Sequence, residues 1–233
     1  MQKFMGDFLG ENIPVTGNGA ENFPRSGAAL VIANHRCWLD PIFIARVVPR
    51  PIQWGGIDFH FKIPVVRRIA AEAGIIPIHV EGGKKSSESL RMASDILKKS
   101  RNDLVGLFPE GAANFLNPSD EEKIIRFHTG FARIALDAKV PVIPIAVVGR
   151  KERQIAHVPG AVVSVFTPLE AFKEHGATLL LYGSAHIEVG KPISLEKYYA
   201  QPLTKELLHR ISSHARKKVV ELYEKGLKSK IRG

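Results

Sequence analysis

Short apolar runs alternate with amphipathic stretches along most of the chain. Runs rich in valine, isoleucine, leucine and alanine are typical of buried strands, which we expect at 28–33, 75–80, 104–108, 142–148, 162–166 and in part of 178–189. Apolar residues spaced three or four positions apart, or an Asp-Pro start, predict helices, which we expect at 41–48, 88–99, 127–139 and 204–225. This alternation predicts an α/β fold, a single domain in which a mixed, largely parallel sheet is flanked by helices.

The domain organisation follows from where this pattern begins and ends. Residues 1–24 contain several prolines and glycines and are expected to form a lead-in segment. The α/β domain is expected over 25–200, and a C-terminal amphipathic helix with a basic tail, 201–233, is expected to pack on it. Within the domain, 50–74 has no clear assignment, and the polar segment 112–126 is long enough to be a lid.

The chain is strongly basic, with 33 lysine and arginine residues against 23 aspartate and glutamate residues and a formal net charge of +10. Such a surface suits anionic lipid, the phosphates of a coenzyme or nucleic acid, although a solvated helix face explains it equally well. Because no nucleic-acid motif accompanies the charge, we expect a membrane surface rather than nucleic acid as partner. The stretch from Trp54 to Arg68 mixes aromatic and basic residues, as interfacial segments do.

The sequence predicts a cytoplasmic protein that lies peripherally on the inner face of the cell membrane. Its one cysteine excludes an intrachain disulfide and fits a reducing compartment. No segment approaches the roughly 18 consecutive apolar residues that a membrane span needs. Residues 1–10 lack the apolar stretch of a signal peptide.

Two short motifs directly follow predicted strands. The strand at 28–33 is followed by Asn34-His35-Arg36-Cys37-Trp38-Leu39-Asp40, and the strand at 104–108 ends in Phe108-Pro109-Glu110-Gly111. In an open α/β sheet, residues just past the carboxyl ends of strands line the ligand crevice. A histidine near a carboxylate can act as a general base, so His35 and Asp40 are candidates. Each motif alone also has a structural interpretation, since Asp40 before Pro41 is a good helix N-cap and Glu110 can belong to a turn.

The two motifs together resemble those of the glycerolipid acyltransferase superfamily, which includes lysophosphatidic acid and glycerol-3-phosphate acyltransferases. The order of the motifs, their separation of 75 positions (110 − 35) and the later block Val140-Pro141-Val142-Ile143-Pro144-Ile145 carry the resemblance, which extends over about 28–193. It implies a glycerol-3-phosphate acyltransferase-like fold. It also implies an O-acyltransferase of phospholipid synthesis, which moves a fatty acyl group from acyl-CoA or acyl carrier protein to a hydroxyl of a lysophospholipid-like acceptor, by default 1-acylglycerol-3-phosphate.

The resemblance implies a catalytic pair and a set of substrate-binding residues. His35 would be the general base, because neutral imidazole suits this role near pH 7, and Asp40 would orient its ring. The expected substrate-binding residues are Glu110, Gly111, Asn34 and Arg36. Because a thioester is already activated, we expect neither a metal nor a cofactor beyond the acyl donor.

Two departures from the family pattern leave the acceptor open. Arginines that members using glycerol phosphate carry are replaced here by Val80 and Ala113. Arginine forks are the usual phosphate holders, so either another cation holds the phosphate or the acceptor is a phosphate-free hydroxyl lipid or glycolipid. The cations that could substitute are Arg36, Lys84, Lys85, Lys123 and Arg126.

Cys37 stands where the family usually has serine, which leaves a second mechanism open. A cysteine beside an imidazole can be a covalent nucleophile and form an acyl-enzyme, whereas free cysteine otherwise behaves as a small buried apolar residue. A further class of function is a non-catalytic lipid- or nucleic-acid-binding module with the same fold.

Overall fold

The structure of the protein is a computed structural model that describes residues 13–57, 68, 74–79, 83–100, 102–111, 114, 123–163, 174 and 176–229. Seven strands form the central sheet: β1 (Val15–Asn18), β2 (Ala29–Ala33), β3 (Gln53–Ile57), β4 (Ile76–Ile78), β5 (Leu104–Leu107), β6 (Val142–Arg150) and β9 (Ser184–Val189). A separate ribbon pairs β7 (Arg153–Val158) with β8 (Ala177–Leu181). The α-helices are α2 (Asp40–Ala45), α4 (Gly83–Lys99), α6 (Gly130–Ala138), α7 (Gly160–Val163) and α9 (Lys205–Lys228), and two 3-10 turns lie at Ala20–Asn22 and Glu196–Tyr198.

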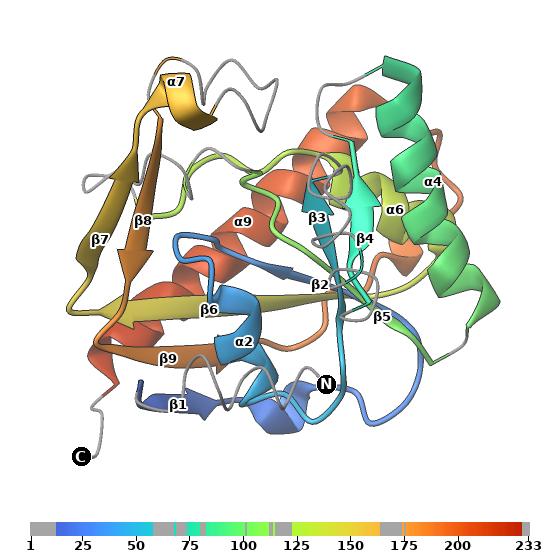
Figure 1. Ribbon diagram of the computed structural model, residues 1–233. Coiled ribbons are helices and arrows are strands. Elements are labelled where there is room, and N and C mark those ends of the chain that lie inside the picture. The colour runs from blue at the N-terminus through green and yellow to red at the C-terminus, as the bar shows by residue number, and fades with distance from the viewer. Residues whose placement is uncertain are drawn as a thin grey trace.

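The central sheet is mixed and mostly parallel, as the alternation of strands and helices predicts. Its strand order is β1-β9-β6-β2-β5-β3-β4 (Figure 1). Only the β6–β9 junction is antiparallel, and every other neighbouring pair in this sheet is parallel. The carboxyl ends of β5, β2 and β6 therefore meet at one edge of the sheet.

Side chains of the central strand β2 alternate between two cores, as the period of two in a strand requires. Leu30 and Ile32 pack with residues of α4, α6 and α9, whereas Ala29, Val31 and Ala33 pack with α2 on the other face. Figure 1 shows α2 in front of the sheet and α9 running behind it. Because both faces are covered, β2 is apolar at every position.

The long helix α9 is attached to the end of β6 as well as to the core. Leu207, Ile211 and Val219 lie on its buried stripe. The guanidinium of Arg150 donates a hydrogen bond of 2.9 Å to the carbonyl of Gly226 and further bonds to the carbonyls of Leu227 and Ser229. A cation at the C-terminus of a helix satisfies its last carbonyls and its dipole.

Several elements differ from those predicted. Residues 15–18, within the segment 1–24 that was expected to be a lead-in, form the edge strand β1, because backbone pairing with β9 outweighs its weak apolar pattern. β3, in the unassigned 50–74, and the exposed β7 were also missed.

The strand expected at 162–166 is wrong at its start, since Val162 and Val163 belong to α7, and 164–166 lie outside the described residues. α4 begins at Gly83 rather than 88, and α6 begins at Gly130 rather than 127. The possible lid at 112–126 falls largely on residues outside the described part, as do Val80, Ala113 and residues 58–67.

Candidate functional site

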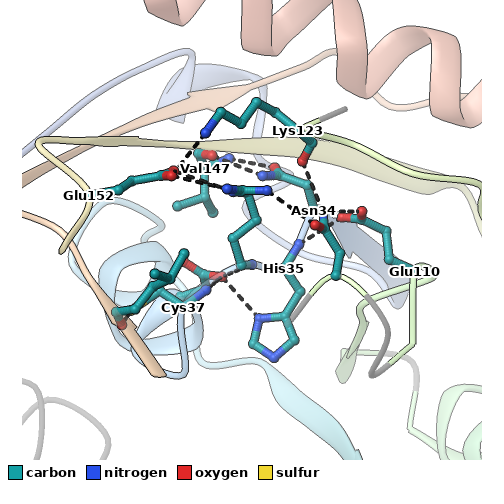
Figure 2. Close-up of polar contacts among 11 residues, drawn as sticks. Asn34, His35, Cys37, Glu110, Lys123, Val147 and Glu152 are labelled. Atoms are coloured by element: carbon teal, nitrogen blue, oxygen red, sulfur yellow. Dashed lines mark hydrogen bonds and ion pairs between the residues drawn. The ribbon is translucent and has the colours of Figure 1, made fainter. Parts of the chain in front are cut away.

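Three adjacent parallel strands each end in a loop that carries a carboxylate of one polar cluster. Glu110 follows β5, Asp40 and His35 follow β2, and Glu152 follows β6. Figure 2 shows these loops converging, with Glu152 on one side of Asn34, Glu110 on the other and Lys123 above. This is the edge at which α/β sheets bind ligands.

Asp40 holds the loop after β2 in shape through a single oxygen. Its Oδ2 accepts hydrogen bonds from His35 Nδ1 at 2.9 Å, from the Arg36 amide at 2.8 Å and from the Cys37 amide at 2.9 Å. The side chain is fully buried. The alternative N-cap interpretation of Asp40 is wrong, because the carboxylate binds the amides that precede α2 rather than those of its first turn.

The His35 ring is clamped on its flat side by aromatic residues. It stacks on Phe108 with ring centroids 4.0 Å apart, and Phe108 stacks in turn on Trp54 at 4.5 Å. The His35 side chain keeps 16% exposure. With Nδ1 donating to Asp40, the neutral ring presents Nε2 as its proton acceptor. Trp54, which was expected to belong to a membrane-contact stretch, is instead only 6% exposed.

The Glu110 carboxylate is buried and hydrogen-bonds to groups of other loops rather than facing solvent. Its Oε1 accepts from the His35 amide at 2.9 Å, and its Oε2 accepts from Asn114 Nδ2 at 2.6 Å and from the Ile125 amide at 2.9 Å. No part of Glu110 is exposed. Both oxygens are occupied in joining three loops, and the contact of Glu110 with the acceptor stays a prediction. Gly111, with a φ of 67°, supplies the left-handed residue of the adjoining turn.

Burial sets the protonation behaviour of Glu110. Loss of hydration disfavours the carboxylate and raises its pKa above the ordinary value. The amides of Ile125 and His35 and the side chain of Asn114 oppose this shift only in part.

Arg36 is buried and bound to protein groups. Its guanidinium donates to Glu152 Oε2 at 3.0 Å and Oε1 at 3.3 Å, and to Asn114 Oδ1 at 3.1 Å. Glu152 also accepts from Lys123 Nζ at 3.0 Å. Burial alone would lower the pKa of Arg36, but the Glu152 carboxylate outweighs it and raises that pKa. Arg36 is only 1% exposed, and its substrate-binding role stays a prediction.

Asn34 also has a structural place. Its Nδ2 donates to the Val147 carbonyl at 2.9 Å, and its Oδ1 accepts from the Val147 amide at 2.8 Å. These bonds extend the pairing of β2 with β6 by one side chain, and no part of Asn34 is exposed. The contact of Asn34 with substrate stays a prediction.

Cys37 does not have the surroundings of a nucleophile. Its thiol is fully buried and donates to the Leu180 carbonyl at 3.2 Å. Burial, followed by the Asp40 charge, raises the pKa of the thiol far above its usual range. Since the thiolate is the nucleophilic form, this geometry favours the structural interpretation of Cys37.

Sequence reasoning missed Glu152 and Asn114. Glu152 could have been found by the rule that selected His35 and Glu110, because it too follows the carboxyl end of a strand. Of the other candidate phosphate holders, Lys84, Lys85 and Arg126 are exposed. Among the described residues, no group of three or more histidine, cysteine, aspartate or glutamate side chains is placed to hold a metal ion. Within the same residues, no helix is long and apolar enough to cross a membrane.

Comparison with known proteins identifies the family. The sequence model of the acyltransferase family matches residues 14–148, which is more than half of the chain and includes β2, β5 and most of β6. The chain belongs to the acyltransferase family. A crystal structure of the 1-acyl-sn-glycerophosphate (LPA) acyltransferase PlsC from Thermotoga maritima has the same fold, with a TM-score of 0.62 and 18% identity over 100% of this chain and 83% of that one.

Relatives of this acyltransferase chain include both uncharacterized and named proteins. Uncharacterized proteins of Mycobacterium bovis and Mycobacterium tuberculosis are each 27% identical over 196 residues, which is 78% of this chain and 52% of theirs. A 1-acyl-sn-glycerol-3-phosphate acyltransferase of Borreliella burgdorferi is 21% identical over 133 residues, 57% of this chain and 50% of that protein. The chain thus spans about half the length of the curated relatives it matches.

The buried Glu110 predicts how stability depends on pH. A carboxyl whose pKa is raised on folding stabilises the protein most below its unfolded pKa, and this contribution is lost as pH rises through the folded pKa. Glutamine cannot ionise. We therefore expect the free energy of unfolding of wild type, relative to Glu110→Gln, to fall as pH rises above about 4.3, with a slope of at most about 1.4 kcal/mol per pH unit.

Urea unfolding of both proteins at a series of pH values measures this difference. Asp137→Asn is the matched contrast, because Lys98 and Ser94 lower the pKa of Asp137. Its contribution is present above the unfolded pKa and lost as pH falls, so the sign is opposite. Parallel curves for wild type and Glu110→Gln would contradict the burial described for Glu110.

Proposed function

We propose that this acyltransferase moves a fatty acyl group from a thioester to a hydroxyl of a lysophospholipid-like acceptor, with His35 as general base. The observation that carries the proposal is the His35 Nδ1 to Asp40 Oδ2 bond of 2.9 Å at a partly exposed ring. A buried carboxylate on Nδ1 fixes the tautomer in which Nε2 accepts a proton, and it stabilises the imidazolium that forms.

The reaction is direct transfer. As the acceptor oxygen attacks the thioester carbonyl carbon, His35 Nε2 takes the hydroxyl proton. The tetrahedral intermediate then collapses, the carbon–sulfur bond breaks, and the imidazolium returns the proton to the leaving thiolate. The bound Cys37 thiol supports direct transfer over an acyl-enzyme.

The groups that surround His35 position it as the base. Glu110 holds the His35 backbone, and Phe108 holds the ring face. A general base acts efficiently only when it lies within hydrogen-bond reach of the proton that it takes. Because these contacts are buried, the loop needs little reorganisation when substrate binds.

The default acceptor is 1-acylglycerol-3-phosphate, the compound in the name of the Borreliella burgdorferi relative. A phosphate-free hydroxyl lipid or glycolipid is the second candidate. It is favoured because Arg36 and Lys123, two cations near the site, are both paired with Glu152 rather than placed to bind a phosphate. Acyl-CoA or acyl carrier protein is the proposed donor.

The protein is proposed to work at the cytoplasmic surface of the membrane as a peripheral protein. The β7–β8 ribbon, with α7 at its end, extends from the edge of the sheet (Figure 1). Ile155 and Val162 are both 49% exposed, and Lys151 and Arg153 are exposed at the base. Apolar side chains beside cations suit an anionic lipid surface. Glu152, at the start of the ribbon, also belongs to the candidate site.

The His35 assignment and the activity are tested together. Wild-type protein and one acyl-CoA are incubated with phosphate-bearing and phosphate-free acceptors, and acylated products and free coenzyme A are measured by mass spectrometry. We expect product from wild type and about 10²- to 10⁴-fold slower turnover for His35→Ala, the usual contribution of a general base. His209→Ala, at an exposed position of α9, is the matched control. Near-wild-type rates for folded His35→Ala would refute the assignment.

A one-atom change distinguishes a structural role of Cys37 from a covalent one. Cys37→Ser keeps a small donor to the Leu180 carbonyl but removes the thiol. We expect most of the turnover to remain. An inactive, folded Cys37→Ser variant, together with an acyl thioester on Cys37 found by peptide mass spectrometry, would establish the covalent route instead.

Membrane contact is tested by co-sedimentation with anionic and neutral vesicles. We expect stronger binding to anionic vesicles, weakened by salt, and a marked loss of binding in the double variant Ile155→Asp/Val162→Asp. Met92→Asp/Leu203→Asp is the matched control, because these side chains have similar exposures of 48% and 51% away from the ribbon. Equal losses in both variants would contradict the ribbon as contact surface.

A further inference from the structure

Two buried polar atoms beside the His35 loop lack a hydrogen-bond partner among the described residues. They are Asp40 Oδ1 and the hydroxyl oxygen of Tyr182; a third such atom is Arg150 Nε. Asp40 and Tyr182 are 0% and 1% exposed. Buried polar groups in proteins are almost always paired, so each of these atoms calls for an explanation.

Tyr182 is packed against the elements that build the loop. Its ring stacks on Phe43 of α2, the helix that Asp40 begins, with centroids 5.8 Å apart. The ring lies so close to the backbone of β6 that a Cβ on Gly149 would come within 2.2–2.5 Å of three of its atoms. The neighbouring Leu180 accepts the hydrogen bond of the Cys37 thiol. The tyrosine is thus fixed beside the loop that Asp40 organises.

The third unpaired atom lies on the other side of the sheet. Along β6, Val147 packs in the core that contains Tyr182, whereas Val148 packs in the core that contains α9. Arg150 follows the same alternation as Val148 and binds the carbonyls at the end of α9. The two atoms left on the α2 face are complementary, since a carboxylate oxygen accepts and a phenol donates.

We propose that one ordered water links the Tyr182 hydroxyl, as donor, to Asp40 Oδ1, since neither atom has a direct partner among the described residues, and that Tyr182 is a positioning residue for the His35–Asp40 pair. Its effect on turnover rests on the proposed function; the hydrogen bond itself does not. Asp40 Oδ2 already carries three bonds, so a donor on Oδ1 fixes the rotation of the carboxylate and hence the direction of its bond to His35 Nδ1.

The electrostatics of Tyr182 agree with a donor. Burial, followed by the Asp40 charge, raises the pKa of the phenol well above its usual value. The hydroxyl therefore keeps its proton across the pH range in which an imidazole titrates.

Thermal unfolding of Tyr182→Phe tests the hydrogen bond without any activity. The ring and its packing on Phe43 and Gly149 are kept, and only the hydroxyl is lost. A paired hydroxyl leaves Asp40 Oδ1 without its donor, so we expect a lower Tm. An unpaired buried hydroxyl is itself destabilising, so an unchanged or higher Tm would overturn the proposal.

A double-mutant cycle identifies the partner. The Tm loss caused by Tyr182→Phe should shrink when Asp40→Asn is already present, whereas the control Tyr199→Phe, at a tyrosine on the other core, should add independently to Asp40→Asn. Additive losses for Tyr182 and Asp40 would overturn the proposal. If Asp40→Asn does not fold, the single Tyr182→Phe result still decides.

The positioning role is read from steady-state kinetics with the acceptor found in the screen. We expect Tyr182→Phe to lower kcat about fivefold, the effect of one ordinary hydrogen bond, while KM stays unchanged. Unchanged kcat in a variant with lower Tm would show a purely structural tyrosine and overturn the positioning role. If wild type transfers no acyl group, the proposed function fails, and the cycle still tests the hydrogen bond.

Discussion

Buried carboxylates need donors, and this requirement shapes the whole edge of the sheet. Asp40, Glu110 and Glu152 follow three neighbouring strands; buried Asp40 binds groups of its own loop, whereas buried Glu110 and half-buried Glu152 bind groups of other loops. Each loop takes the conformation that supplies those donors. A buried charge that loses its partners is costly, so the three loops stabilise one another and hold the His35 ring where Nδ1 meets a carboxylate.

The side chains of the first motif bind in two directions from the loop after β2. The Asn34 side chain hydrogen-bonds to Val147 within β6, and the Arg36 side chain forms an ion pair with Glu152 after β6. His35 points the other way, toward the aromatic stack and Asp40. Neighbouring residues of this loop therefore contact different parts of the structure.

Sequence patterns predicted the central strands and the positions of His35, Asp40 and Glu110, because buried parallel strands are continuously apolar and functional groups follow their ends. The weak strands β1 and β7 were missed because pairing partners far along the chain, rather than local propensity, determine them. The internal hydrogen bonds of Glu110 were not predicted. The sequence motif identifies a carboxylate, but only the fold shows that it already accepts hydrogen bonds from Asn114 and Ile125.

The chain contains two tryptophans, and both flank the same loop. Trp54 is buried at one end of the three-ring stack that ends in His35, whereas Trp38, three positions after His35, is 41% exposed. Tryptophan fluorescence of the unmodified protein, excited selectively over its four tyrosines, therefore reports on this edge of the sheet alone. A water-soluble quencher such as iodide would reach Trp38 but not Trp54, so the two emissions can be separated. Ligand arrival could then be followed optically without a label.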